Sequence, residues 1–163
     1  MQRKLDKWKA RAKTFDLPLL DAIGVSPLSE MTYFWNGFKR MVLDQLELTL
    51  QRLDWSKKSA KVPWGSEDED ERAVAALLRG TVLRHLGRTE EARKVLKDNV
   101  TDLDRNLLKG GLKDNWTAPS AHYETGVTYW VDYQKTGEVE NLVESQKWLD
   151  IVAAWEAYDL DAR

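Results

Sequence analysis

Apolar residues recur at every third or fourth position along most of the chain, which is the periodicity of helices that bury one face. The first apolar stripe, which includes Trp8 and Phe15, predicts a helix over residues 2–15. Residues 16–28 contain two prolines and a glycine and are therefore a predicted connector. The apolar residues that follow keep helical spacing and predict one long helix over residues 29–54.

Glycines mark the helix ends predicted in the second half of the chain. One helix is predicted to end at Gly87, and the next opens at Thr89. A further helix over about 119–136 ends at Gly137, and a last helix covers about 139–157. No segment alternates apolar and polar residues in the manner of a half-buried strand. The pattern therefore predicts an all-α fold of about six helices.

The helix that ends at Gly87 is preceded by an acidic run, Glu67–Glu71. Ser66 and Glu69 have the spacing of a capping box. The run lacks the glycine and the alternating oxygen ligands of a calcium loop. We therefore expect its carboxylates to sit at the positive end of the helix dipole rather than to bind a cation.

Two predicted helix pairs share a pattern of small residues. Gly80 lies on the first helix of one pair and Ala92 on the second helix. Gly126 and Ser145 take the same roles in the other pair. A small residue on each side of a helix crossing lets the two helices approach closely. The matching large residues on the second helices are Leu96 and Leu149.

This pattern resembles the tetratricopeptide repeat, in which helix pairs of about 34 residues stack into a solenoid. The predicted fold is an all-α helix-hairpin array, a tetratricopeptide-like α-α superhelix. It forms a single domain over residues 1–163, with repeat-like units at about 73–104 and 119–157.

The stretch GLKDNWTAPSAHYETGVTYW, residues 111–130, can be interpreted as a ligand pocket or as the start of a repeat. Thr117 can act as N-cap, with Pro119 in the first turn. Trp116 is then predicted to fill a gap, and Gly126 to be a helix crossing. Because no glycine-rich loop follows a strand, a nucleotide-binding fingerprint is absent. The stretch is therefore predicted to open a repeat.

The composition of the chain argues against several kinds of partner and binding site. The net charge of −2 does not indicate nucleic acid as a partner. The absence of cysteine excludes disulfides and thiolate metal sites. The two histidines, His85 and His122, lie on different predicted helices, which does not favour zinc. No arrangement of a catalytic nucleophile and base is present. We therefore expect no catalytic residue, no metal site and no cofactor.

Four segments together resemble a known family. They are PLSEMTYFWNGFKRM (27–41), LLRGTVLRHLGRTEEA (77–92), LKDNWTAPSAHYETG (112–126) and WLDIVAAWEAYDLDAR (148–163). They are similar to the C-terminal part of the fungal inclusion body clearance proteins, which are tetratricopeptide-like. The resemblance implies a fragment of a longer protein, without enzymatic activity, that helps clear misfolded-protein inclusions in association with lipid droplets. It also implies cytosolic, nuclear and mitochondrial outer-surface locations.

The leading functional hypothesis is a scaffold that binds other proteins. The first helices of such hairpins usually line the concave face, so Arg79, His122 and Tyr129 are predicted to be exposed there. Trp64, between Pro63 and Gly65, is a candidate surface contact.

The alternative hypothesis is a module that binds lipid surfaces. Residues 1–13 contain six basic residues and one acidic residue, the profile of a helix on an anionic membrane. The competing interpretation packs the apolar stripe on the helix of residues 29–54 and leaves the bases solvated. Four tryptophans at helical positions are expected in the core: Trp35, Trp130, Trp148 and Trp155.

Overall fold

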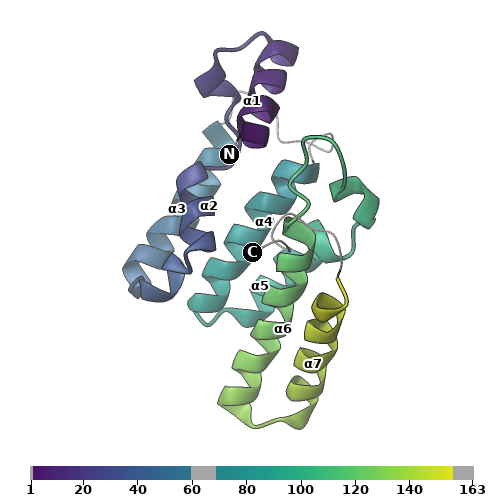
Figure 1. Cartoon of the computed structure of the whole chain (residues 1–163). Coiled ribbons are helices and arrows are strands. Elements are labelled where there is room, and N and C mark those ends of the chain that lie inside the picture. The colour runs from purple at the N-terminus through teal and green to yellow at the C-terminus, as the bar shows by residue number, and fades with distance from the viewer. Residues whose placement is uncertain (1, 60–68, 156–163) are drawn as a thin grey trace.

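The computed structural model describes residues 2–59 and 69–155 (Figure 1). These residues form seven α-helices and no strand, which confirms the predicted all-α fold. The α-helices are α1 (Gln2–Phe15), α2 (Pro27–Phe34), α3 (Leu43–Ser59), α4 (Glu69–His85), α5 (Thr89–Leu96), α6 (Thr117–Thr136) and α7 (Val139–Ala153). Short helical turns lie between them: η1 (Leu19–Ala22), η2 (Gly37–Arg40), η3 (Lys97–Thr101) and η4 (Arg105–Leu108).

The prediction of one helix over residues 29–54 is wrong. The chain leaves α2 at Asn36, which takes the left-handed conformation with φ of 52°, and α3 begins only at Leu43. Asn followed by Gly is a turn signal, because asparagine tolerates positive φ better than most residues. The turn points Phe38 into the core and leaves Trp35 75% exposed. The expected core position of Trp35 is therefore also wrong.

The second half of the chain forms two antiparallel hairpins, α4–α5 and α6–α7 (Figure 1). Gly87 and Gly137 turn them with φ of 77° and 73°, values that favour glycine. Helix α6 begins at Thr117, and its N-cap is Trp116. The prediction of Thr117 as N-cap is therefore wrong, and its hydroxyl donates instead to the Asp114 carbonyl at 2.8 Å.

Each hairpin closes around a glycine. A Cβ on Gly80 would lie 2.8 Å from Leu96 Cδ2, and one on Gly126 would lie 3.2 Å from Leu149 Cδ2. The small residues on the second helices are Ala92, with 0% exposure, and Ser145, with 2%. The repeat-like units at about 73–104 and 119–157 stay a prediction, because residues 156 and 157 lie outside the described residues.

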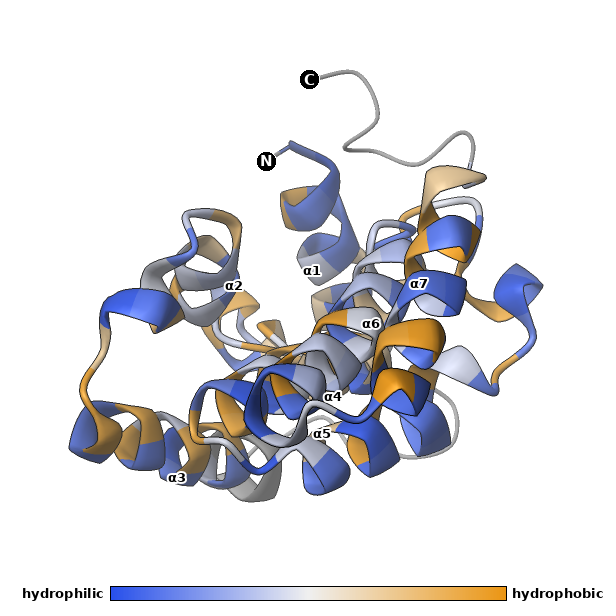
Figure 2. Cartoon of the chain, turned by 90° about the horizontal axis from the view of Figure 1, so that it is seen from below, coloured by the Kyte–Doolittle hydropathy of each residue, from blue (hydrophilic) through white to orange (hydrophobic). Residues whose placement is uncertain are grey.

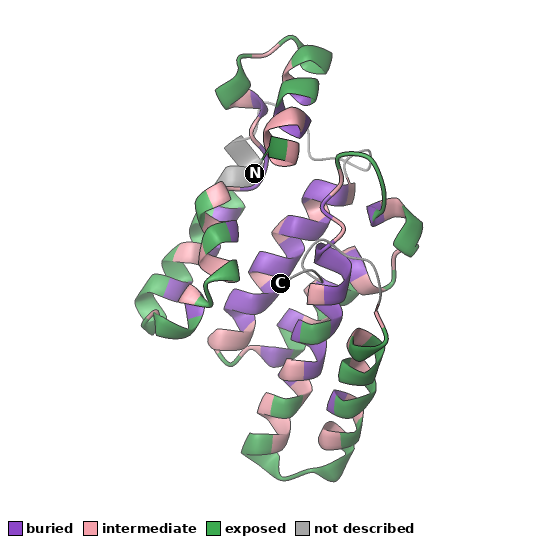
Figure 3. Cartoon of the chain, viewed as in Figure 1, coloured by how far each residue is buried: buried purple, intermediate pink, exposed green. Residues whose placement is uncertain are grey.

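Helix α4 lies at the centre of the fold, in contact with α3, α5 and α6. Its residues Val74, Leu77 and Leu78 have no exposed surface, and Figure 3 shows many buried positions along this helix. Neighbouring helices cover these apolar residues, which removes their surface from water. The outer helices α3 and α7 instead leave apolar side chains such as Leu48 and Val143 exposed. Figure 2 marks the hydrophobic positions along the helices. None of the described helices is both long enough and apolar enough to cross a bilayer.

Candidate functional site

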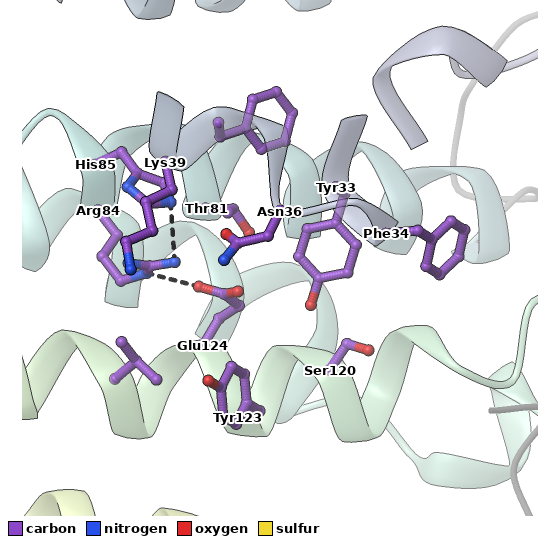
Figure 4. Close-up of a pocket in the computed structure, with 12 residues that line it drawn as sticks. Tyr33, Phe34, Asn36, Lys39, Thr81, Arg84, His85, Ser120, Tyr123 and Glu124 are labelled. Atoms are coloured by element: carbon purple, nitrogen blue, oxygen red, sulfur yellow. Dashed lines mark hydrogen bonds and ion pairs between the residues drawn. The ribbon is translucent and has the colours of Figure 1, made fainter. Parts of the chain in front are cut away.

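A cleft of about 620 Å³ opens between the α2–η2 segment and the first helices of both hairpins, α4 and α6 (Figure 4). Helix α4 contributes Thr81, Arg84 and His85, which share one face because they are three and four positions apart. The same spacing places one face of α6 on the opposite wall. That wall consists of Ser120, Tyr123, Glu124 and Val127.

The third wall depends on the turn at Asn36. It carries Tyr33 and Phe34 to one part of the cleft and Lys39 to another (Figure 4). Trp116 supports the two aromatic rings, with ring centroids 5.9 Å from Tyr33 and 4.6 Å from Phe34. Trp116 is 4% exposed. The predicted gap-filling role of this tryptophan agrees with its burial, although its ring partners come from α2.

A short chain of polar contacts crosses the floor of the cleft. Arg84 Nε donates to Glu124 Oε2 at 2.7 Å, and Arg84 Nη2 lies 3.2 Å from His85 Nε2. Burial raises the pKa of Glu124 against the attraction of Arg84. Burial and then the charges of Arg84 and Lys39 lower the pKa of His85 to about 4. At neutral pH His85 is therefore uncharged, and its Nε2 accepts from Arg84.

The residue types that line the cleft are those of surfaces that bind other proteins. They combine exposed aromatic rings with cationic and amide donors, which is the composition of protein contact surfaces. Over the described parts of the chain, no three His, Cys, Asp or Glu side chains are grouped so that they could hold a metal ion.

A second polar cluster attaches α1 to the rest of the fold. Lys4 Nζ lies 2.8 Å from both Glu30 Oε2 and Asp114 Oδ2. Lys7 Nζ lies 2.9 Å from Glu71 Oε1 and 3.0 Å from Asp114 Oδ2. The further pairs in this ion-pair cluster are Lys7 with Asp70 and Arg11 with Glu71.

Burial in the ion-pair cluster contradicts one expectation. The bases of α1 do not all lie on a solvated face, because Lys7 and Arg11 are 9% and 8% exposed. The acidic residues Glu69, Asp70 and Glu71 lie in the first turn of α4, as expected, and Asp70 and Glu71 are in addition buried, with 4% and 0% exposure. Ser66 of the predicted capping box lies outside the described residues.

The electrostatics of the cluster follow from this crowding. Burial opposes the charge of Lys7, but Glu71, Asp70 and Asp114 outweigh it and raise its pKa above the ordinary value. Burial raises the pKa of Glu30 to about 7, although Lys4 attracts its charge. Glu30 Oε1 is buried and has no hydrogen-bond partner among the described residues. The burial of the Glu30 carboxylate therefore destabilises the folded state.

The three predicted groove residues do not come together. Arg79 pairs with Asp54 of α3. His122 is 6% exposed and contacts Trp148 and Trp155, with ring centroids 5.3 Å and 5.0 Å away. The prediction that His122 is an exposed groove residue is therefore wrong.

The third groove residue, Tyr129, is half-buried beneath Arg93, whose Cζ lies 4.4 Å from the ring centroid. Trp64 lies outside the described residues. Trp148 and Trp155 are half-buried, and Trp130 is 41% exposed, so the prediction of Trp130 in the core is wrong.

The three predicted groove residues lie on α4 and α6, which line the cleft, but none of the three lines it. Tyr123 lines the cleft, whereas His122 faces α7, because one residue along an α-helix turns the side chain by about 100°. The stripe Thr81, Arg84 and His85 was a usable signal, since it places polar groups on one face of the second half of α4, where most other residues are apolar.

Comparison with known proteins agrees with this fold. The family model described as Iml2/Tetratricopeptide repeat protein 39 matches residues 1–86, more than half of the chain. The inclusion body clearance protein iml2 of Aspergillus terreus is 40% identical, and the match covers 99% of this chain and 26% of the relative. The protein of the same name from Pyricularia oryzae is 40% identical over 100% of this chain and 22% of its own length.

A more distant relative carries the same name. The inclusion body clearance protein of Yarrowia lipolytica is 32% identical over 100% of this chain and 23% of its own length. The chain thus spans about a quarter of the length of these curated relatives. No solved structure matches the chain. With a matching family model and these relatives, the chain belongs to the Iml2/tetratricopeptide repeat protein 39 family.

Proposed function

We propose that this chain contributes to the clearance of misfolded-protein inclusions by binding another protein in the cleft between α2–η2, α4 and α6. The clearance role is suggested by the names of the relatives. The binding role is suggested by tetratricopeptide-like architecture, which commonly serves protein recognition. In this proposal the chain has no catalytic activity of its own.

The observation that carries the proposal is the exposure of aromatic rings on two facing walls. Phe34 of α2 is 41% exposed and Tyr123 of α6 is 47% exposed, and both line the cleft. Large aromatic residues in a concave site contribute strongly to binding energy, because they bury much apolar area at little cost in side-chain entropy.

Photo-crosslinking in cells that contain inclusions tests the proposal. A photoreactive phenylalanine analogue replaces Tyr123 within the full-length protein, and the control places it at Val143, which is exposed on α7. We expect a defined protein adduct from position 123 and none from position 143. The same adducts from both positions, or none from position 123, would contradict binding in the cleft.

A clearance assay tests the cellular role. Tyr123→Ala is expected to slow the disappearance of inclusions of a misfolded reporter. Trp55→Ala, which removes a 69% exposed ring on α3, is expected to leave clearance unchanged. Equal clearance by both variants at equal protein level would reject the link between the cleft and inclusions.

The proposal also includes association with lipid droplets. It further includes cytosolic, nuclear and mitochondrial outer-surface locations. Both additions rest on the family resemblance alone. The alternative module, in which α1 lies on a lipid surface, has less support. Lys4, Lys7 and Arg11 point their charges at buried carboxylates, so they are not available to anionic lipid while α1 stays docked.

A further inference from the structure

The cleft has two chemically different ends. Lys39 of η2 and Arg84 of α4, beside the uncharged His85, form a basic end. Tyr33 and Phe34 of α2 form the aromatic end, and Tyr123 of α6 lines the stretch between the two ends (Figure 4). A ligand that fills the cleft must satisfy both ends at once.

The basic end contains hydrogen-bond donors that no described residue engages. Arg84 engages its Nε with Glu124 and its Nη2 with His85, whereas its Nη1 makes no hydrogen bond to any residue that the structure describes. Lys39 is exposed and forms no ion pair with a described residue. Glu124 also lines the cleft, but it is 3% exposed and pairs with Arg84 at 2.7 Å, so it offsets the Arg84 charge. Lys39 therefore leaves this end with a net positive charge, and its complement is an anionic group.

The buried Trp116 ring supports the aromatic end of the cleft. The Phe34 ring rests on Trp116, with ring centroids 4.6 Å apart, and the Tyr33 ring lies beside it, with ring centroids 5.9 Å apart. A rigid aromatic pocket favours a large apolar side chain, which gains contact area without ordering the pocket. The cleft volume of about 620 Å³ is enough for a few side chains and too small for a folded domain.

We propose that the cleft binds a segment of the partner protein in which an Asp or Glu residue lies near a large apolar residue. The carboxylate sits between Lys39 and Arg84, and the apolar side chain packs on the aromatic residues of the cleft, which include Phe34 and Tyr123. This inference rests on the proposed function and adds the chemistry of the partner. Charge complementarity at one end and shape at the other select this segment.

Selection from a library of short random peptides tests the inference without assuming a sequence. The bait is the 163-residue chain, and the parallel bait is Lys39→Glu, a change at an exposed residue. We expect peptides enriched on the first bait to pair Asp or Glu with Phe, Leu, Trp or Met, and to be lost on the second. Neutral or basic peptides, equal enrichment on both baits, or no enrichment would overturn the inference.

Fluorescence anisotropy then measures the best peptide with both termini blocked, so that only side-chain carboxylates are present. Lys39→Glu and Tyr123→Ala are each expected to weaken binding by about tenfold or more. The controls Lys94→Glu and Trp55→Ala change exposed residues outside the cleft and are expected to have no effect. Binding that survives replacement of Asp and Glu by Asn and Gln would overturn the inference.

Two further binding measurements distinguish a side-chain carboxylate from other anionic ligands of the cleft. Binding that requires a free peptide C-terminus, or that inorganic phosphate alone displaces completely, would overturn the assignment of a side-chain carboxylate. The crosslink at position 123 separates the two proposals. A protein adduct there without selection of acidic peptides removes the inference and keeps the proposed function, whereas no adduct removes the proposed function itself.

Discussion

A Cβ on Gly80 of α4 would lie 2.8 Å from Leu96 Cδ2 of α5, closer than side chains normally approach. Gly80→Ala improves helix propensity by about 1 kcal/mol, but the clash must displace Leu96, and overpacking typically costs about 1–3 kcal/mol. We therefore expect Gly80→Ala to lower the free energy of unfolding measured by urea titration. Gly126→Ala meets Leu149 Cδ2 at 3.2 Å and should cost less. The reverse order would contradict the packing of the two hairpins.

Lys7 is expected to hold α1 on the fold. Lys7→Met leaves Asp70, Glu71 and Asp114 buried with too little positive charge, so it should destabilise the docked helix by roughly 3–5 kcal/mol. Amide hydrogen exchange should show loss of protection in α1. The control is Lys9→Met on the exposed side of the same helix, where a change within about 0.5 kcal/mol is expected. Equal protection of α1 in both variants would show that the ion-pair cluster does not hold the helix.

Glu30 is expected to make stability depend on pH. Burial raises its pKa from 4.5 to about 7, so the folded chain binds this proton more tightly than the unfolded chain. The folded state therefore loses stability through Glu30 as pH rises from 4.5 to about 7, and no further above that value. Glu30→Gln keeps the neutral shape and should gain roughly 3 kcal/mol over the unsubstituted chain across this window.

Urea titrations on both sides of that pH window measure the effect. Glu90→Gln, at an exposed residue of α5, is the control and should shift stability equally at both pH values. A difference between Glu30→Gln and the unsubstituted chain that stays constant across the window would refute the assignment.

Substitutions of Trp116 and Trp35 should differ sharply in their effect on stability. Trp116 is 4% exposed and supports Tyr33 and Phe34, so Trp116→Ala is expected to cost about 3–5 kcal/mol. Trp35 is 75% exposed, and Trp35→Ala should stay within about 0.5 kcal/mol. Thermal melts of the two variants decide this. A large loss at Trp35 would restore the uninterrupted helix and reject the turn at Asn36.

Trp8 distinguishes a docked α1 from a lipid-bound one. It is 9% exposed, so Trp8→Ala is expected to lower the melting temperature and to leave partitioning into anionic vesicles unchanged. The unsubstituted chain should stay in solution in a flotation assay at physiological salt. Strong flotation that Trp8→Ala abolishes without loss of stability would favour the lipid-surface hypothesis instead.

Much of the fold could be predicted because its signals are local. Gly87 and Gly137 end helices through a positive φ that few other residues adopt, and their neighbours keep helical periodicity. The turn at Asn36 was equally local, since Asn followed by Gly breaks a helix, but the surrounding apolar residues outweighed it in the prediction.

The candidate site was harder to predict because it depends on which face of a helix a neighbour covers. Arg79, His122 and Tyr129 lie on α4 and α6, which line the cleft, yet each contacts a different neighbour outside it. A register error of one residue separates His122 from Tyr123 in the cleft, because periodicity gives the period of a helix and not its rotation.

The sequence by itself determined the all-α class, the glycine turns and the small residues within each helix, since each depends on residues a few positions apart. Only the tertiary structure decided which charged side chains are buried and with which partners they pair. Lys7 meets Asp70 and Asp114, which follow it by 63 and 107 positions, and no local pattern indicates that a lysine in a basic helix will be buried. Long-range pairing follows from which surfaces pack together, because buried charges must find partners wherever the fold places them.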